Sequence, residues 1–576
     1  MNASNNQICK RIPNLSIFKW GDFHKVDFTS NQLEGAIPMF LFNVTALHLS
    51  RNKFSNLNCL CDVKGRASLV FLDISFNQLS GTLPDCWSSL DSLAVLNLAH
   101  NYNLSGKLPT SIGSMLSIQT LHLGNNNFRG GLPSSWKNCP RLVAFDVGEN
   151  NLSGSIPSWI EESLTKLSIL VLRSNHFNGN IPSNICHLQS LQVLDLSMNN
   201  ISGSLPTCVG NFTEIHKVGG IHATISYLIY VPIPASSATL FMRREDKIEV
   251  VCKGVMSEFG RTLGLVKSID LSCNMLNGEI PSEITLLIGL VSLNLSRNSL
   301  SGQIPSMIGD INSSNSKDIG ELEHLKLLGN TLEGLILEAF CNMASLTYLD
   351  LSNNYLNVSI PKSLGNMTVL THLDLFGNNL EGSYILEAFT KASLTNLDAN
   401  NLKGSIPITL GNLGSTLTHL DLFEGFIPES FGYNMFMLTH ISLENNQLED
   451  PIPEAFSRLP LSLKECKVLV VMDVGHNNLS RPIPTWIGKT LPYLLILNLK
   501  SNHFYGKIPM SLRDLPHLQL LVLSINNISG SIPKCLSNFS KMRTIKTIEA
   551  TAITYYYDSD QTGAPISNSG TYEDET

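Results

Sequence analysis

The sequence predicts an α/β-type repeat solenoid, in which short coils stack so that their strands form one long concave parallel sheet. Three observations lead to this prediction. The pattern LxxLxLxxNxxxGxxP, clearest at residues 191–206, recurs from end to end of the 576-residue chain. Most neighbouring asparagines of the pattern lie 24 or 25 residues apart. The LxL core alternates as a short half-buried strand does.

Each part of the pattern has a physical role. Alternation in LxL sends two leucines inward, so each coil supplies one strand. The asparagine amide both donates and accepts, and it can satisfy backbone groups that no adjacent strand reaches. We therefore expect a ladder of asparagines that includes Asn150, Asn175, Asn199, Asn274 and Asn298. We count 19 coils, one of which, at 420–428, has lost its asparagine. This period is the signature of a leucine-rich-repeat solenoid, whose core forms only between neighbouring coils.

Composition and motifs argue against several function classes. Charged residues make up 15% of the chain, the net charge is −8, and no basic block appears, which argues against nucleic acid as a partner. Gly488-Lys-Thr490 resembles the end of a phosphate-binding loop, but Ile483 stands where that motif needs glycine. Repetition explains the Thr-His pairs at His372, His419 and His440 better than metal binding does. We expect no enzyme activity, no metal and no cofactor.

Aspartates recur at one point of the strand and would line one face of the sheet. We interpret them as polar packing and ligand surface rather than as a row of calcium sites. They are Asp73, Asp146, Asp195, Asp270, Asp350, Asp374, Asp421 and Asp473.

Cysteines and sequons favour an exported protein. Fourteen Asn-x-Ser/Thr sequons occur, and Asn43, Asn211 and Asn312 are glycosylation candidates outside the repeat consensus. Cys186 and Cys208 lie in adjacent coils, four and two residues after their prolines, so we predict a disulfide between them. Cys59 and Cys61 indicate loop cysteines or a disulfide rather than a metal site.

The ends of the chain carry no visible targeting or anchoring segment. Residues 1–10 hold no apolar signal-peptide core, and no apolar run reaches 18 residues. We therefore expect no membrane span in this chain. Residues 1–22 are interpreted as an incomplete N-terminal segment that leaves the first coil uncapped.

The period breaks between repeats at 23–208 and repeats at 267–311, which leaves a non-repeat island at 209–266. The island ends in Lys253-Gly254 and Glu258, followed by Val-Lys-Ser-Ile-Asp-Leu-Ser and Gly-Glu-Ile-Pro. These residues, with Leu-Ser-Gly-Ser-Ile-Pro at 152–157, resemble plant leucine-rich-repeat receptor-like proteins, especially the class that detects fungal xylanase. Cys252 and Phe259 depart from that family's tryptophan and tyrosine. The resemblance implies a right-handed plant-type superhelix.

A second array follows a polar seam at 312–320. It spans 321–536 and repeats features of the first at an offset of 327 residues, so the chain reads as two partial copies fused. Residues 537–576 then correspond to a truncated second island, for which we predict a disordered tail.

We therefore predict non-catalytic recognition of a peptide, glycan or protein ligand. Non-consensus side chains expected on the ligand face are Arg173, Met198, Arg297, Phe376, His476 and Lys500. The resemblance implies a place at the extracellular face of the plasma membrane and a co-receptor kinase that meets the repeats at 274–305. Two alternatives stay open: a secreted inhibitor or decoy, like the plant inhibitors of polygalacturonase, and a non-functional fragment of two fused receptor genes.

Overall fold

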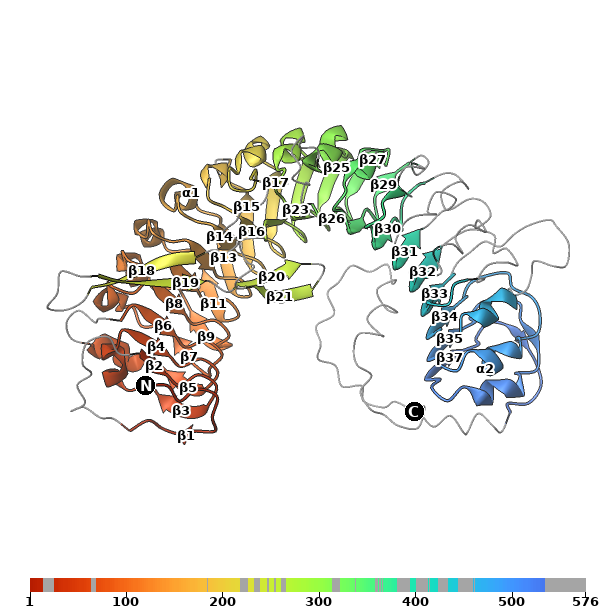
Figure 1. Ribbon diagram of the computed structural model, residues 1–576, viewed down its shortest axis with the longest axis horizontal. Coiled ribbons are helices and arrows are strands. Elements are labelled where there is room, and N and C mark those ends of the chain that lie inside the picture. The colour runs from red at the N-terminus through yellow and green to blue at the C-terminus, as the bar shows by residue number, and fades with distance from the viewer. Residues whose placement is uncertain are drawn as a thin grey trace.

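The computed structural model shows an arch built of stacked coils (Figure 1). It describes residues 1–13, 25–63, 69–183, 185–217, 226–232, 239–245, 248–252, 255–259, 266–312, 322–336, 338–357, 361, 364, 366–380, 394–399, 413, 415–422, 434–443, 459 and 461–533. The core runs along the whole arch, because each coil buries its leucines against the next.

One long parallel sheet confirms the predicted solenoid. Its 19 strands in the described chain pair in the order of the coils, with middle residues in register, for example Leu194 with Ile269. The strands are β2 (Lys25–Asp27), β4 (Ala46–His48), β6 (Phe71–Asp73), β8 (Val95–Asn97), β10 (Thr120–His122), β12 (Ala144–Asp146), β14 (Ile169–Val171), β16 (Val193–Asp195), β22 (Ser268–Asp270), β24 (Ser292–Asn294), β26 (His324–Lys326), β28 (Tyr348–Asp350), β30 (His372–Asp374), β31 (Asn396–Ala399), β32 (His419–Leu422), β33 (His440–Ser442), β34 (Val471–Asp473), β35 (Ile496–Asn498) and β37 (Leu520–Val522).

A second parallel sheet follows the asparagine corners. Its strands are β7 (Ser80–Thr82), β9 (Asn103–Gly106), β11 (Asn127–Gly130), β13 (Asn151–Ser155), β15 (His176–Asn180), β17 (Asn200–Ser204), β23 (Met275–Glu279), β25 (Ser299–Gln303), β27 (Thr331–Gly334) and β29 (Tyr355–Leu356). Shorter sheets of the same kind lie near the two ends: β1 (Cys9–Lys10), β3 (Gln32–Ala36) and β5 (Lys53–Asn56), then β36 (Tyr505–Gly506) and β38 (Asn527–Ile528).

Short helices carry the chain back to the next strand. In Figure 1 the strands β30 to β37 run along the inner side of the arch, and α2 lies outside them. The α-helices are α1 (Trp159–Ser163) and α2 (Trp486–Thr490). The 3-10 helices are η1 (Met39–Asn43), η2 (Asn58–Asp62), η3 (Trp87–Leu90), η4 (Thr110–Ser114), η5 (Ser134–Asn138), η6 (Ile185–His187), η7 (Thr207–Asn211), η9 (Ser282–Leu286), η10 (Ser306–Asn312), η11 (Glu338–Asn342), η14 (Leu461–Glu465) and η15 (Met510–Asp514).

The island and the seam interrupt the period but not the stack. The island contains two antiparallel pairs, β18 (Ser226–Pro232) with β19 (Thr239–Glu245) and β20 (Ile248–Cys252) with β21 (Val255–Phe259). Around it, β16 pairs directly with β22 and β17 with β23. Across the seam, β24 pairs with β26 and β25 with β27. The two arrays therefore form one continuous sheet, because strand pairing needs matching coils rather than a constant linker.

The N-terminal segment forms a further partial coil. Asn5 adopts a left-handed φ of 55°, and the Asn6 side-chain amide donates to the carbonyls of Ala3 and Ser4 at 3.1 and 2.9 Å. The backbone amide of Ala3 bonds the Asp27 carbonyl at 2.8 Å. Leu33 of the first coil is buried, although we interpreted residues 1–22 as leaving that coil uncapped.

Several predictions fall on residues that the structure leaves undescribed. They concern Lys253 and Gly254 of the island, residues 313–320 of the seam and the tail beyond residue 533. Among the helices that the structure does describe, none combines the length and the apolar character needed to cross a bilayer.

Candidate functional site

Asparagine side chains hold the concave sheet in place from behind. The Asn175 amide donates to the Val147 carbonyl of the preceding coil at 3.0 Å and to the carbonyls of Leu172 and Arg173 in its own turn at 3.1 and 3.0 Å. Its oxygen accepts from the Leu152 amide at 2.9 Å. Asn150, Asn199, Asn274 and Asn298 make the same set of contacts. Asn274 reaches across the island to the Leu196 carbonyl at 3.0 Å, so the ladder is continuous there.

The residue before each ladder asparagine takes a left-handed conformation. Met198, Arg297 and His476 have φ values of 54°, 54° and 51°. L-residues rarely adopt this conformation, yet side chains as different as Arg, Phe and Ile occupy the position. Met198 is 57% exposed and Arg297 is also exposed, whereas His476 is half-buried. Sequence reasoning selected these three residues without recognising the backbone conformation that they share.

The other residues expected on the ligand face lie one position earlier. Phe376 and Lys500 are half-buried. Arg173 is only 4% exposed, which corrects the expectation that it is an exposed contact residue. Its guanidinium lies 3.4 Å from the Glu149 carboxylate and 3.7 Å from that of Asp195. Arg173 therefore links three coils of the concave face.

The carboxylates of the strand aspartates accept hydrogen bonds from backbone amides two residues later in the chain. The carboxylate of Asp195 accepts from the Ser197 amide at 3.1 Å and from the Ser197 hydroxyl at 2.6 Å, and Asp270 binds Ser272 in the same way. This contact explains the recurring Asp-Leu-Ser and agrees with the interpretation as polar packing. Burial, reinforced by the neighbouring charge of Asp270, raises the pKa of Asp195 to about 7 against the opposing effect of Arg173.

Basic neighbours shift the pKa of Asp146 in the opposite direction, below its usual value. Burial alone would raise the pKa of Asp146, but a hydrogen bond from His122 and the charges of His122 and Arg173 hold it below its usual value. The His122 Nδ1 and Asp146 Oδ2 atoms lie 3.6 Å apart.

An apolar patch covers part of the concave face beside this network. Ile169, Val171 and Val193 on β14 and β16 are at most 1% exposed, although alternation turns them away from the main leucine core. Val266, the last residue of the island, packs in the same cluster. The end of the island at Val266 therefore lies against the concave face at β16. Glu258 of the island is exposed.

In the part of the chain that the structure describes, two disulfides join neighbouring coils. Cys186 and Cys208 are bonded, with Cα atoms 5.8 Å apart. Cys61 and Cys86 form a second bond that sequence reasoning did not assign. Of the glycosylation candidates, Asn43 and Asn211 are exposed, and Asn312 ends η10.

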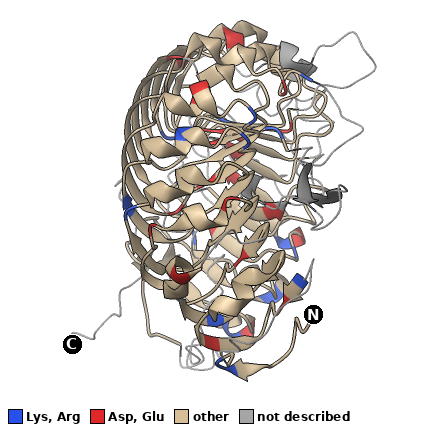
Figure 2. Ribbon diagram, turned by 90° about the vertical axis from the view of Figure 1, so that its left-hand side faces the viewer, with Lys and Arg blue, Asp and Glu red and all other residues tan. Residues whose placement is uncertain are grey.

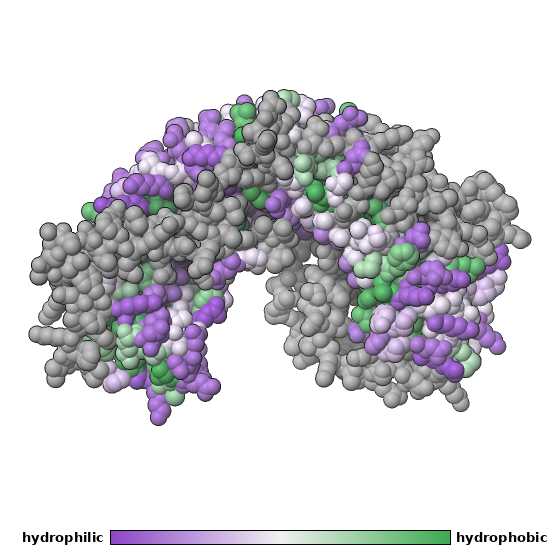
Figure 3. Space-filling model, viewed as in Figure 1, coloured by the Kyte–Doolittle hydropathy of each residue, from purple (hydrophilic) through white to green (hydrophobic). Residues whose placement is uncertain are grey.

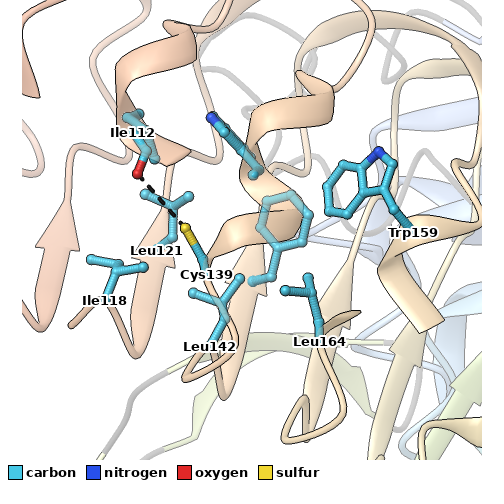
Figure 4. Close-up of a pocket in the computed structure, with 9 residues that line it drawn as sticks. Ile112, Ile118, Leu121, Cys139, Leu142, Trp159 and Leu164 are labelled. Atoms are coloured by element: carbon cyan, nitrogen blue, oxygen red, sulfur yellow. Dashed lines mark hydrogen bonds between the residues drawn. The ribbon is translucent and has the colours of Figure 1, made fainter. Parts of the chain in front are cut away.

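We searched the described residues for clusters of side chains that could bind a metal ion. No group of three or more His, Cys, Asp or Glu side chains there could hold a metal ion. A cavity of about 10 Å³ lies inside the first array, where apolar side chains surround Cys139 (Figure 4). The Cys139 Sγ atom lies 3.7 Å from the Ile112 carbonyl oxygen. Such a space barely admits one water molecule, so it is a packing gap. Gly488, noted for its phosphate-loop context, is buried in α2 against the backbone of Ser511.

Charge is spread thinly over the molecule. Figure 2 shows acidic and basic residues scattered among uncharged ones on the face turned to the viewer. Figure 3 shows the arch hollowed on its inner side, with polar and apolar residues mixed over its described surface. The candidate functional site is therefore the concave face itself, a broad surface without a deep cleft.

Comparisons with known proteins agree with this architecture. Two family models described as leucine-rich repeat match, one at residues 320–380 and the other at 68–90, 117–139, 166–188, 190–212, 289–311 and 437–459. Receptor-like protein EIX2 of Solanum lycopersicum is 41% identical over 318 residues, which cover 51% of this chain. The chain therefore carries leucine-rich repeats and is similar to plant receptor-like proteins. The match spans 28% of the tomato receptor-like protein's length.

Several solved structures similar to this chain are plant receptors. The plant peptide hormone receptor RGFR1 in complex with RGF2 superposes with a TM-score of 0.69 and 28% identity over 93% of this chain and 80% of that one. The Arabidopsis receptor kinase HAESA, in complex with the peptide hormone IDA and the co-receptor SERK1, gives a TM-score of 0.57 and 28% identity over 90% of this chain and 85% of that one.

Proposed function

We propose that the chain recognises an extracellular peptide, glycan or protein ligand on its concave face, at the outer side of the plasma membrane. The observation that supports this most is the unbroken sheet from β2 to β37, whose residues before the ladder asparagines present varied side chains from a fixed backbone. A platform that is ordered beforehand binds with little further loss of conformational entropy. Relatedness to receptor-like proteins, and likeness to ectodomains solved with peptide hormones, support the same conclusion.

A co-receptor kinase is the proposed signalling partner, and the repeats at 274–305 are its proposed contact. Arg297 is exposed in this stretch, on the coil after that of Cys273. The HAESA complex contains a co-receptor, which makes this role reasonable for a related ectodomain.

The continuous stack also bears on the alternatives. Asn330 bonds the Leu295 carbonyl at 3.1 Å across the seam, as a ladder asparagine does inside one array. This contact supports one folded body rather than two unrelated fragments.

The test is a binding experiment with the full chain against plant co-receptor ectodomains and against peptides and cell-wall glycans. Arg297→Gly removes the side chain at a position whose φ of 54° suits glycine, so the backbone is preserved. Met307→Ala in η10, at a residue 57% exposed, is the control outside the concave face. We expect Arg297→Gly to weaken co-receptor binding roughly tenfold, as for loss of about 1.4 kcal/mol, and Met307→Ala to leave it unchanged. Equal effects of the two substitutions would contradict the proposed contact.

A further inference from the structure

Four consecutive strands in the second half carry an aspartate at the same point of the concave face. Asp350 of β28 is in register with Asp374 of β30, which is in register with Asp398 of β31, and that with Asp421 of β32. We call these four residues the aspartate column. Adjacent strands lie about 4.8 Å apart, and like charges directly opposite each other destabilise a sheet.

The first half of the molecule avoids this arrangement. Asp73 lies between His48 and Asn97 on the neighbouring strands. Asp146 lies between His122 and Val171. Asp195 and Asp270 are adjacent, but the Arg173 guanidinium lies 3.7 Å from the Asp195 carboxylate.

Cations face the aspartate column at its first end. Lys326 of β26 precedes Asp350 in register, with its Nζ 4.7 Å from the centre of the Tyr348 ring, and the charges of Lys326 and Arg297 act on Asp350. Beyond the aspartate column, Ser442 is in register with Asp421, and Asp473 is in register with Ser442. Burial and the charges of Asp350 and Asp421 raise the pKa of Asp374 to about 7. Burial and the other three carboxylates raise the pKa of Asp398 well above its usual value.

Histidines lie beside the aspartate column on β30 and β32 and on the flanking strands β26 and β33. His324, Tyr348, His372, Asn396, His419 and His440 follow one another in register. Glu323 is 4.0 Å from the His324 imidazole. The rings of His419 and His440 stack with centroids 4.1 Å apart.

Threonine hydroxyls determine how these histidines are protonated. Thr371 donates its hydroxyl hydrogen to the Thr347 carbonyl at 2.9 Å, and Thr418 and Thr439 bond the preceding threonine in the same way. Each hydroxyl has one hydrogen, so it accepts from the adjacent histidine Nδ1, at 2.8 to 2.9 Å. The neutral histidines therefore carry their proton on Nδ1. Burial, with the charge of His419, lowers the pKa of His440 to about 4.

We propose that the concave face from β28 to β33 is a proton-controlled segment of the solenoid, closed in mildly acidic solution and loosened in alkaline solution. Asp350, Asp374 and Asp398 bind protons more tightly in the folded than in the unfolded chain, so their stabilisation is complete below the ordinary aspartate pKa and is lost as the pH rises, through about 7 for Asp374. The histidines bind protons less tightly when folded. For His372, His419 and His440 this stabilisation is present above the ordinary histidine pKa and is lost as the pH falls, toward about 4 for His440. Between these two pH limits, the aspartate column and the histidines beside it are therefore both close to uncharged.

Hydrogen exchange of the full chain at about pH 5.5 and about pH 8, corrected for intrinsic rates, tests the proposal. We expect amides at 346–357, 415–422 and 434–443 to open roughly tenfold more often at the higher pH, since one pKa unit corresponds to a tenfold change. Amides at 71–101 serve as the internal reference. Asp374→Asn with Asp398→Asn should abolish the difference, whereas Asp73→Asn, at an isolated aspartate, should not affect it. Equal opening of the wild-type segment at both pH values would overturn the proposal.

A second measurement needs no variant. Protonated carboxyl groups give their own carbonyl band in the infrared, and exposed aspartates are ionised at about pH 6. The wild-type protein should show this band at that pH, with a contribution from Asp195 as well as from the aspartate column, and the band should weaken at about pH 8. Absence of the band at the lower pH would refute proton storage in the aspartate column, even if a variant failed to fold.

Discussion

Replacing Asn175 by alanine tests the central structural element, the ladder that joins one coil to the next. Asn175 is 4% exposed, and its side chain contacts both its own turn and the coil before it. Alanine would leave the buried Leu152 amide and the Val147 carbonyl without these partners. An unsatisfied buried backbone group costs about 1–3 kcal/mol. We expect about 2–6 kcal/mol of local destabilisation from the two groups together.

The assay is hydrogen exchange at single amides, because a long array of repeats need not unfold in one step. The loss should appear as opening that is at least about thirtyfold more frequent at Leu152 and Phe177, since each 1.4 kcal/mol is a factor of ten. Amides after β30 should not change, because each coil contacts only its neighbours.

Asn151→Ala is the matched control, since Asn151 is an exposed asparagine next to the ladder position. It should change stability by less than about 0.5 kcal/mol. If Asn175→Ala costs no more than Asn151→Ala, the asparagine ladder does not hold the coils together and the reasoning fails.

Three further substitutions test single features. Cys208→Ser opens a link between residues 22 apart and should lower stability by about 3 kcal/mol in thermal unfolding without reductant, whereas Cys9→Ser at an exposed free cysteine should not. Gly488→Ala forces a methyl group onto the Ser511 backbone and should cost about 1–3 kcal/mol, in contrast to Gly131→Ala, where the nearest atom is 3.5 Å away. Met198→Gly should be neutral or stabilise the protein by up to about 1 kcal/mol, because glycine suits the left-handed backbone there. Met275→Gly in β23 should instead destabilise it by about 0.5–1 kcal/mol. Equal unfolding temperatures for these two variants would contradict the backbone argument.

The sequence by itself determined the coils, because each role depends on residues within one repeat. Leucine alternation located the strands, such as β16, and the fixed spacing located asparagines such as Asn199. The same local logic placed Cys186 and Cys208 in adjacent coils. The resemblance around residues 253–281 led to the receptor-like class, to which the comparisons also point.

Only the tertiary structure decided which coils are neighbours across the interruptions, and therefore what is buried. Asn274 meets Leu196 although 78 residues separate them, and no local pattern encodes that contact. Arg173 looks like a surface residue in its repeat, yet Glu149 and Asp195 from the two adjacent coils surround it. Asn6 belongs to a coil without the leucine pattern, so periodicity could not find it. Burial and charge depend on neighbours from other coils, whereas periodicity describes one coil at a time.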